Sequence, residues 1–285
     1  MSWSTPVVDE EKRLIPCNLC GGHDFLAHLF CEGFFYVRCA DCGLVQINPQ
    51  PLNEEVRKRY DAAFGEDYFA YELSNENNFL NLQLQALKDI GFEKLERELI
   101  LNGRNMRVLD IGCATGALLA WLRERGWETT GLEISGPQAE YARQKKGLDI
   151  RSVPLENNKF PDGTFEVVWA SHLIEHLNDP AGMLREVWRI LAPKGRFLVT
   201  TPNVAGFQAR LFKTRWRSAI FDHLYLFSLK TLRRLLRENG FIIEKTACWG
   251  GLALGTAPAP IKYMFDRAAK AFGFGDVIII RAKKP

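Results

Sequence analysis

The sequence has no long hydrophobic segment and no sign of a secretion signal. No apolar run reaches the roughly 18 residues that a membrane-spanning helix needs. The opening stretch, MSWSTPVVDEEKR, lacks the apolar core of a signal peptide. Internal repeats and low-complexity tracts are also missing. These absences argue against a membrane-spanning or repeat architecture and lead us to expect a cytoplasmic protein.

The sequence also lacks a strong charge of either sign. Its 37 lysines and arginines against 34 acidic residues leave a formal net charge of only +3, too small by itself to indicate a nucleic-acid partner. The chain has 285 residues, of which 47% are hydrophobic and 25% charged, as in a globular protein with one large or two unequal domains. Seven cysteines in a cytoplasmic chain indicate metal ligands or free thiols instead of disulfides.

Two Cys-x-x-Cys pairs near the N-terminus predict a zinc ribbon. They are separated by 18 residues, a spacing typical of zinc sites, and supply four thiolates: Cys17, Cys20, Cys39 and Cys42. Segments 34–39 and 43–48 are expected to pair as a hairpin, with His23, His28 and Cys31 in the loop between the cysteine pairs. The alternative is a set of four reduced core cysteines. A four-cysteine site has no open coordination position, so we expect structural zinc that stabilises folding.

The rest of the chain divides into a helical and an alternating part. Residues 1–52 are predicted to be the ribbon with its proline-marked linker, and residues 53–104 a helical lead-in with apolar positions at helical spacing. From 105 to 285, strand and helix patterns alternate, which predicts an α/β fold with a parallel sheet. Strands are expected at 107–112, 128–133, 149–152, 165–171, 195–201, 241–249 and 276–285. Helices are expected at about 116–125, 136–146, 180–191 and 229–240.

The stretch RVLDIGCATG, from Arg107 to Gly116, is typical of a nucleotide-like ligand site. It joins a strand to a helix through a glycine turn, so the backbone can approach a ligand and the helix N-terminus offers free N–H groups. Its pattern is G-x-x-x-G and not the G-x-G-x-x-G of dinucleotide sites. The next strand ends in Glu133, at the spacing where a carboxylate binds a ribose diol.

Three motifs together resemble the class I S-adenosylmethionine-dependent methyltransferases: DIGCATG (110–116), LEIS (132–135) and FEVVWASHLIEHL (165–177). The resemblance covers roughly residues 75 to 285. It implies a Rossmann-like seven-stranded sheet whose last strand is antiparallel. Ala114 stands where the family often has a glycine. In this family the lead-in region often forms a lid over the cofactor; the alternative is core packing of its aromatic residues, Tyr60, Tyr68, Phe69 and Tyr71.

The resemblance also implies a set of donor-binding residues. Asp110, Gly112, Cys113 and Gly116 would shape the donor pocket, and Glu133 would bind the ribose hydroxyls. Ile134 would lie against the adenine, Ser171 ends the fourth strand at the ligand edge, and the backbone at Leu155 would read the adenine edge because Pro154 replaces the usual acid. Three structural alternatives remain: a strand-end cap for Asp110, an exposed carboxylate for Glu133 and plain packing for Cys113.

The segment SHLIEHL places His172, Glu175 and His176 on one face of a helical turn. These side chains form a catalytic base, a metal site or a polar cluster that fixes the loop. Quinone O-methyltransferases have a similar acidic-x-x-Glu-His set that is thought to bind a divalent cation, but here His172 replaces the first acid. We expect His176→Ala to lower turnover far more than cofactor affinity.

Residues 203–226 form an insertion where class I enzymes often build the acceptor site. Four cations alternate there with aromatic residues, namely Arg210, Lys213, Arg215 and Arg217. An acceptor that carries phosphate or carboxylate suits this surface; the alternative is a solvated basic helix. His223 is a second candidate base. Residues 249–275 have no family pattern and would cap the acceptor pocket, pair with a second subunit or touch a membrane surface. The sequence does not set the oligomeric state.

These observations predict a methyltransferase that uses S-adenosylmethionine and contains structural Zn²⁺. The acceptor atom is expected to be oxygen or nitrogen of a small molecule: a sugar, a nucleotide sugar, or a quinone or lipid precursor. A zinc ribbon ahead of this domain resembles sugar methyltransferases. An RNA methyltransferase is the first alternative, although no broad basic footprint supports it. A binding or scaffold protein without turnover is the second.

Overall fold

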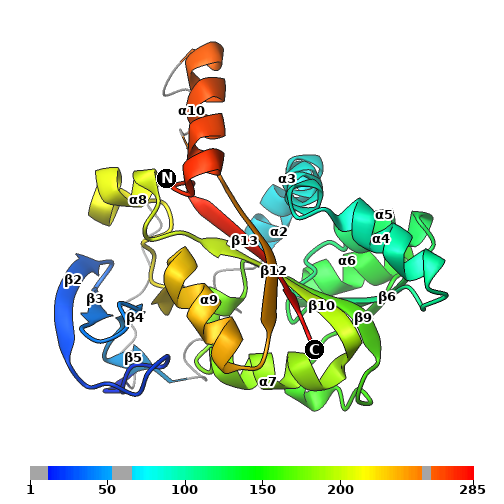
Figure 1. Ribbon diagram of the computed structural model, residues 1–285, viewed down its shortest axis with the longest axis horizontal. Coiled ribbons are helices and arrows are strands. Elements are labelled where there is room, and N and C mark those ends of the chain that lie inside the picture. The colour runs from blue at the N-terminus through cyan, green and yellow to red at the C-terminus, as the bar shows by residue number, and fades with distance from the viewer. Residues whose placement is uncertain (1–11, 53–65, 252–257) are drawn as a thin grey trace.

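A seven-stranded sheet runs through the middle of the molecule in the computed structural model, which describes residues 12–52, 66–251 and 258–285 (Figure 1). Its order is β12-β13-β10-β9-β6-β7-β8. The strands are β6 (Arg107–Ile111), β7 (Glu128–Leu132), β8 (Asp149–Arg151), β9 (Phe165–Ser171), β10 (Leu191–Pro202), β12 (Ile242–Trp249) and β13 (Val277–Lys283). The five strands from β10 to β8 are parallel, and β13 is antiparallel to both neighbours. The predicted Rossmann-like sheet with an antiparallel last strand is confirmed.

Strand residues alternate between two hydrophobic cores, one on each face of the sheet. Along β6, Val108 belongs to one core and Leu109 to the other; along β13, Ile279 and Ile280 divide in the same way. The first core packs under α3 (Glu76–Asp89), α4 (Phe92–Leu101), α5 (Ala117–Glu124) and α6 (Gly136–Lys146). The second packs under α7 (Pro180–Ile190) and α9 (Leu229–Glu238). The result is a three-layer α/β structure.

Local sequence signals explain where several helices begin. Asp179 caps α7 by accepting a hydrogen bond of 2.8 Å from the Gly182 N–H, and Pro180 follows it in the first turn. Ser228 and Thr231 form a capping box at the start of α9. The strand predicted at 195–201 begins earlier, at Leu191, because Pro193-Lys194-Gly195 interrupts the pairing with β9 as a register shift and does not end the strand.

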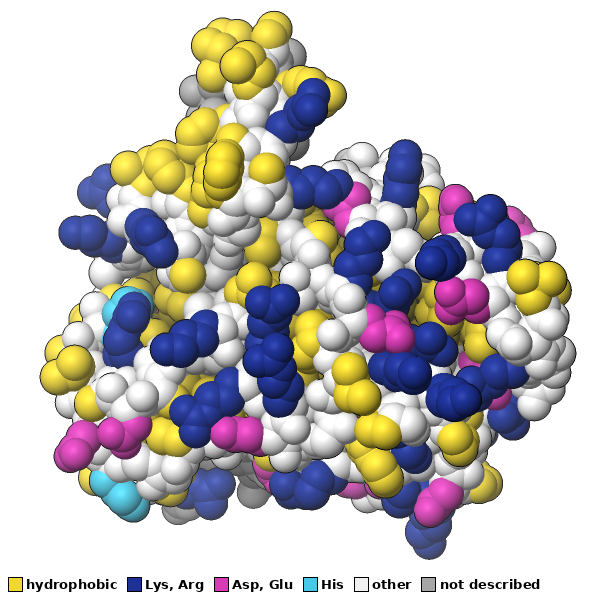
Figure 2. All heavy atoms as spheres, viewed as in Figure 1, with side chains coloured by type: hydrophobic (Ala, Val, Ile, Leu, Met, Phe, Trp, Pro, Cys, Tyr) yellow, Lys and Arg dark blue, Asp and Glu magenta, His cyan; other side chains and the backbone are white. Residues whose placement is uncertain are grey.

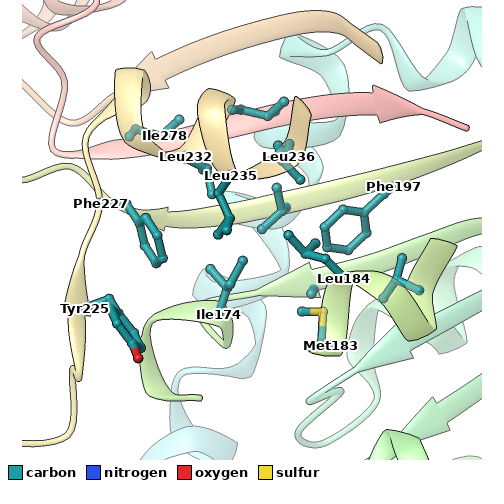
Figure 3. Packing of buried hydrophobic residues seen from close by; sticks show 14 of the residues in the cluster. Ile174, Met183, Leu184, Phe197, Tyr225, Phe227, Leu232, Leu235, Leu236 and Ile278 are labelled. Atoms are coloured by element: carbon teal, nitrogen blue, oxygen red, sulfur yellow. The ribbon is translucent and has the colours of Figure 1, made fainter. Parts of the chain in front are cut away.

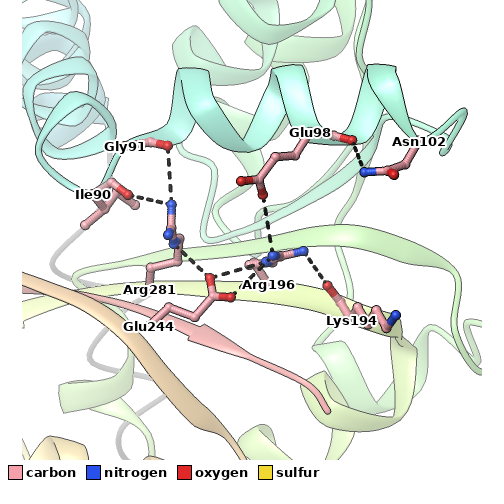
Figure 4. Close-up of polar contacts among 8 residues, drawn as sticks. All are labelled: Ile90, Gly91, Glu98, Asn102, Lys194, Arg196, Glu244 and Arg281. Carbon is pink, nitrogen blue, oxygen red and sulfur yellow. Dashed lines mark hydrogen bonds and ion pairs between the residues drawn. The ribbon is translucent and has the colours of Figure 1, made fainter.

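Two arginines attach the lead-in helices to the far strands of the sheet (Figure 4). Arg281 of β13 donates to the carbonyl of Ile90 at 2.7 Å, just before α4, and pairs with Glu244 of β12. Arg196 of β10 lies between Glu244, at 3.3 Å, and Glu98 of α4, at 3.8 Å. The described part of the lead-in, which includes α2 (Glu66–Ser74), is helical; Tyr60 and the predicted helix start at 53–65 lie outside the described residues.

The ribbon forms a second sheet that includes a strand from the insertion. Its order is β11-β4-β3-β2, with β2 (Phe25–Cys31), β3 (Phe34–Cys39), β4 (Val45–Ile47) and β11 (Tyr225–Leu226). The expected hairpin is present as β3 and β4, but the segment expected as a loop contains strand β2. A further pair joins β1 (Lys12–Arg13) to β5 (Gln50–Pro51).

The ribbon and the sheet share one hydrophobic core. Tyr225 and Phe227 extend it from beneath α9 toward the ribbon, where Tyr36 and Ile47 belong to the same cluster (Figure 3). Ile174, in the SHLIEHL segment, lies at the centre of this packing. The ribbon is therefore packed as part of the same body as the α/β domain.

Helix α10 (Ala259–Phe272) projects from the body of the molecule (Figure 1). It carries four exposed apolar side chains, Ile261, Tyr263, Met264 and Phe272. Among the described residues, none of the helices has both the length and the hydrophobicity to cross a bilayer.

Candidate functional site

The glycine turn after β6 has backbone angles that favour glycine. Gly112, Ala114 and Gly116 have φ values of +75°, +48° and +74°. A Cβ on Gly116 would lie 2.6 Å from Cδ1 of Leu148, so a larger residue cannot fit without movement. Ala114 adopts this conformation despite its Cβ, at a cost of about 1 kcal/mol. The angle explains why the family often has glycine there.

Glu133 connects the turn to the end of β7. Its Oε2 accepts a hydrogen bond of 2.9 Å from the Ala114 N–H, and its Oε1 accepts one of 2.8 Å from the Ser135 N–H. Burial raises the pKa of this carboxyl, although the backbone donors oppose the shift. Each carboxylate oxygen has a second lone pair, so the carboxylate can hold the turn and still accept from a ribose diol.

Asp110 is buried at the end of β6 with one oxygen unsatisfied. Its Oδ1 has no hydrogen-bond partner among the described residues, which is costly for a buried polar atom unless a ligand supplies a donor. Burial raises the pKa of Asp110 to about 8, and the charge of Glu133 adds to the shift. A ligand with a positive charge and N–H donors fits this site, because it would favour the ionised carboxylate. S-adenosylmethionine has both features.

Helix α2 places two further titratable residues near Glu133. Glu72 accepts a hydrogen bond of 3.2 Å from Gln138 of α6, and burial raises the pKa of the Glu72 carboxyl. Burial also raises the pKa of Tyr68, and the carboxylates of Glu72 and Glu133 add to the shift. The aromatic pattern of the sequence indicated Tyr68 but not Glu72, although the i, i+4 spacing places both on one face of a helix.

The remaining predicted donor residues lie around this turn. Ile134 is 44% exposed, which leaves apolar surface that an aromatic ligand can cover. Leu155 is buried at the start of a short 3₁₀ turn. Ser171 bonds Thr200 of β10 through their hydroxyl oxygens, at 2.7 Å. Cys113 is buried, and burial raises the pKa of its thiol well above the ordinary value. Burial of this kind suits a packing residue better than a nucleophile.

A second cluster follows β9, around the buried side chain of Glu175. His172 has φ +52° and a half-exposed side chain whose Nδ1 lies 3.3 Å from Oε1 of Glu175. Thr201 of β10 donates to Oε2 of Glu175 at 3.0 Å. Burial alone would raise the pKa of Glu175, but the hydrogen bond from His172 and the positive charge that the three surrounding histidines carry when protonated outweigh it and lower the pKa to about 2. These neighbours favour the ionised form of this buried carboxyl.

His176 and His223 lie together, with ring centroids 4.7 Å apart and the planes nearly perpendicular. The Nδ1 of His176 lies 2.9 Å from the Asp222 carbonyl, and that of His223 lies 2.8 Å from the Ser218 carbonyl. A carbonyl can only accept, so each Nδ1 carries the proton and each Nε2 keeps a lone pair. Burial lowers the pKa of both rings, to about 3 for His223.

The structure thus combines two candidate bases that the sequence placed 47 positions apart. Ligand atoms of Glu175, His176 and His223 all lie within 4.8 Å of one another, an arrangement that also suits a divalent cation. The predicted helical turn is a short 3₁₀ turn, Ile174–His176. His172 and His176 do not form one face as expected, because His172 is half exposed and His176 points into the buried interior beside the insertion.

The ribbon contacts both segments that carry these histidines. Tyr36 of β3 donates to the His223 carbonyl at 2.8 Å, and the Ile47 N–H donates to the Leu224 carbonyl at 2.9 Å. Asn178, two residues after His176, donates to the Gln50 side chain at 3.1 Å and to the Pro51 carbonyl at 2.9 Å. The ribbon therefore positions the SHLIEHL segment and the insertion relative to each other.

The four ribbon cysteines converge as a metal site requires. The Sγ atoms of Cys17 and Cys42 lie 3.4 Å apart, those of Cys20 and Cys39 lie 3.5 Å apart, and all four lie within 4.8 Å of one another. Thiolates that share one Zn²⁺ at about 2.3 Å are about 3.8 Å apart in a tetrahedron. Burial raises the pKa of Cys42 to about 11, so a cation is needed to hold this sulfur as a thiolate at neutral pH.

The cations of the insertion divide into two groups. Arg217 binds the buried carboxylate of Asp276 at 2.7 Å, and Trp216 donates to the other oxygen of Asp276 at 2.6 Å. Arg217 therefore has a structural partner and is not part of a free anion-binding surface. Arg210, Lys213 and Arg215 are exposed.

The sheet, the glycine turn and the acidic residue after the second strand define the class I S-adenosylmethionine-dependent methyltransferases. A family model described as a methyltransferase domain matches residues 82–246, and the chain belongs to this family. The chain is similar to a Thermotoga maritima S-adenosylmethionine-dependent methyltransferase, with a TM-score of 0.57 and 22% identity over 81% of this chain and all of that one. That likeness shows the fold.

Curated relatives match a smaller part of the chain. Demethylmenaquinone methyltransferase of Thermus thermophilus is 31% identical over 135 residues, 45% of this chain and 61% of the relative. Ubiquinone biosynthesis O-methyltransferase of Pseudomonas aeruginosa is 32% identical over 104 residues, 34% of this chain and 44% of the relative. The chain thus spans about half the length of the curated relatives that it matches.

Proposed function

We propose that this protein transfers a methyl group from S-adenosylmethionine to oxygen or nitrogen of a small molecule. The observation that carries the proposal is the unsatisfied Oδ1 of Asp110 beside Glu133, at the same sheet edge as the histidine cluster. In this assignment Glu133 binds the ribose and Asp110 faces the positive part of the donor. The turn residues Gly112, Cys113 and Gly116 shape the pocket, while Ile134, Leu155 and Ser171 line its adenine and sheet-edge sides.

For methyl transfer, the protein must mainly orient the donor and the acceptor and remove a proton. The donor, when bound, supplies a methyl group on a positively charged sulfur that leaves as a neutral thioether. The protein must align the acceptor lone pair with this methyl group and exclude water. If the acceptor is a hydroxyl, a base must take its proton as the new bond forms. We assign that proton to Nε2 of His176 or His223, which keeps a lone pair and is neutral at pH 7.

The other two residues of the cluster, Glu175 and His172, assist the histidine that takes the proton. Glu175 stabilises an imidazolium that forms beside it, because it remains ionised and lies within 4.8 Å of both rings. His172, half exposed at the mouth of the cluster, passes the proton toward solvent. We further propose that residues 1–52 are a ribbon with structural Zn²⁺, that 53–104 lid the donor, and that 105–285 hold the catalytic domain with the acceptor insertion 203–226.

Two measurements test the proposal. Calorimetry with S-adenosylmethionine is expected to show binding, and Glu133→Gln to weaken it by about 10-fold or more, since it removes a charged hydrogen-bond acceptor. A labelled-methyl screen against quinone precursors, sugar derivatives and RNA then identifies the acceptor. The relatives named as menaquinone and ubiquinone methyltransferases make quinone precursors the first compounds to test. Absence of donor binding would leave a scaffold protein, and methylation of RNA alone would replace the small-molecule proposal.

A further inference from the structure

A groove with a cationic rim lies between the ribbon and the insertion. Its volume is about 760 Å³, and it is lined from three directions: by β2 and β3 of the ribbon, by α8 (Phe207–Phe212), and by the first turn of α9. The cationic and imidazole side chains are His28, Arg38, Arg210, Lys213 and Lys230. Figure 2 shows Lys and Arg side chains gathered over the ribbon, α8 and α9, with apolar atoms in the hollow between them.

The cations of this groove have no acidic partners. No carboxylate is among its lining residues, and in the described parts of the chain Arg38, Arg210, Lys213 and Lys230 make no ion pair. Several arginines elsewhere are neutralised, for example Arg107 by Glu166 at 3.2 Å. Four unpaired cations around one hollow repel one another, and an anionic ligand would relieve that repulsion.

The backbone and the apolar floor add to the site. The first turn of α9 contributes Ser228 and Leu229 to the lining, so the positive end of a ten-residue helix faces the same hollow. Leu29, Val204 and Ala209 supply apolar surface beneath the charges. A fully hydrated inorganic ion gains nothing from contact with this apolar surface. An organic phosphate has an anionic part that the cations can bind and an apolar part that this surface can cover.

We propose that this groove binds the phosphate or diphosphate group of a small organic molecule. The groove begins at Asn203 and Val204, directly after the end of β10. Two residues earlier, Thr201 bonds Glu175 in the histidine cluster. A ligand anchored in the groove can therefore extend to the methyl-transfer site, and its role as the acceptor rests on the function proposed above. The ribbon, with Arg38 and Gly43, forms one wall of this site.

The shape and charge favour a small molecule over RNA. Four unpaired cations surround one hollow, whereas an RNA-binding surface needs a basic stripe that follows several phosphates. Outside the groove, Arg107 of β6, Arg189 of α7 and Arg196 of β10 are each paired with an acid. The groove volume of about 760 Å³ lies within the range of small-molecule sites.

The test uses the full-length zinc-containing protein with S-adenosylhomocysteine present in excess, so that the donor pocket is filled. Inorganic pyrophosphate and uridine diphosphate are titrated by calorimetry at low salt. Both are expected to bind, uridine diphosphate more tightly because its nucleoside reaches the apolar floor. Arg38→Gln, from the ribbon, and Lys230→Gln, from α9, are each expected to weaken binding about 10-fold or more. Arg237→Gln, an exposed cation near the other end of α9, is the matched control and is expected to leave affinity unchanged.

Three outcomes would overturn the proposal. They are an absence of binding by both anions at low salt, equal losses in the control variant, and displacement of uridine diphosphate by a short RNA at lower concentration. A separate titration with S-adenosylhomocysteine alone reports on the donor site. Failure there contradicts the proposed methyl transfer, while a normal donor titration with no anion binding contradicts only the groove assignment.

Discussion

The carboxyl edge of the central sheet has two halves that are built in different ways. Most of the proposed donor half comes from one segment: the turn after β6, Glu133 after β7 and Leu155 after β8 lie within about 50 residues, each placed by the strand before it. The acceptor half combines the SHLIEHL segment, the insertion 203–226 and the ribbon, with β11 paired to β4 across about 180 residues. One half is mostly local in sequence, with Glu72 and Ser171 joining it from more distant segments, and the other depends on long-range contacts.

The pKa values of the buried acids are shifted in opposite directions in the two halves. Asp110 in the donor half has an unsatisfied oxygen, and its pKa is raised to about 8 by burial and by Glu133. In the acceptor half, His172 lowers the pKa of the buried Glu175 to about 2. The first arrangement has an oxygen without a partner among the described residues, whereas the second has His172 at 3.3 Å from its carboxylate. In the function we propose, the donor half would bind a positive ligand and the acceptor half would transfer a proton.

The largest expected effect comes from removing a ligand of the proposed zinc site. Cys39→Ser should eliminate zinc and loosen β3 and β4, which hold the backbone around His223. Because a displacement of about 1 Å at a catalytic group costs about 100-fold in rate, turnover should fall at least that much. Donor affinity should change little, since the glycine turn makes none of these contacts. Metal analysis, a methyl-transfer assay and calorimetry with S-adenosylhomocysteine provide the three readings.

Cys31→Ser is the control for this variant. Cys31 lies on β2 and donates through its thiol to the Ala219 carbonyl at 2.9 Å, and a serine hydroxyl can replace that bond. Zinc content and turnover should both be retained. A Cys39→Ser protein that loses donor affinity as strongly as turnover would show that the two halves are not separable.

The next largest effect is expected for His176→Ala. Loss of a general base lowers turnover by about 10²- to 10⁴-fold, while donor affinity, which depends on the glycine turn and Glu133, should be kept. Steady-state kinetics and donor titration measure the two quantities, and added Mg²⁺ or Zn²⁺ tests whether a cation bound by Glu175, His176 and His223 contributes. His23→Ala, on the exposed ribbon surface, serves as the control. Unchanged turnover would exclude His176 from the mechanism.

The difference in construction explains what the sequence could predict. The seven strands, the glycine turn and the four cysteines depend on periodicity and short spacing, so they were found from local patterns. Strand β11 has only two residues, too few for a periodic pattern, and is defined only by its pairing with β4. The approach of His223 to His176, the partner of Arg217 and the groove at Arg38 depend in the same way on chain packing. No local pattern encodes such contacts.

A smaller effect is expected for Gly131→Ala, and it should be limited to the donor half. A Cβ on Gly131 of β7 would lie 2.5 Å from Cδ1 of Ile150 and 2.7 Å from both Sγ of Cys113 and Cδ1 of Leu119. Gly131→Ala should therefore lower the free energy of unfolding by about 1–3 kcal/mol. Donor affinity should fall, because Glu133 is two residues away, while pyrophosphate binding in the groove persists. Denaturant unfolding and the two titrations separate these results.

Gly136→Ala provides the comparison on the same segment. Nothing lies within 4 Å of the position that its Cβ would occupy, so its stability should stay within about 0.5 kcal/mol of the parent protein. If Gly131→Ala weakened the groove as much as the donor site, strain would be shared across the whole sheet edge and the local construction of the donor half would be disproved.

The pH dependence of stability should give the smallest difference between the two halves, and one that can be traced to single residues. The pKa of His223 is lowered from 6.5 to about 3, so the unfolded chain binds more protons between these values and stability falls as the pH drops from 6.5 toward 3. The pKa of Asp110 is raised from 3.8 to about 8, so the folded protein binds more protons and stability falls as the pH rises from 3.8 toward 8. Each group contributes at most about 1.4 kcal/mol per pH unit.

Two neutral substitutions separate these slopes in the ligand-free protein. His223→Gln should reduce the loss of stability below pH 6.5, and Asp110→Asn should reduce the loss between pH 6.5 and 8, where the Asp110 contribution is no longer opposed by His223. Denaturant unfolding across pH 4 to 8 measures both. S-adenosylmethionine should abolish the Asp110 slope, since a bound cation favours the ionised carboxylate, and leave the His223 slope in place. If the donor altered both slopes equally, the two halves would respond to the ligand as a single electrostatic unit.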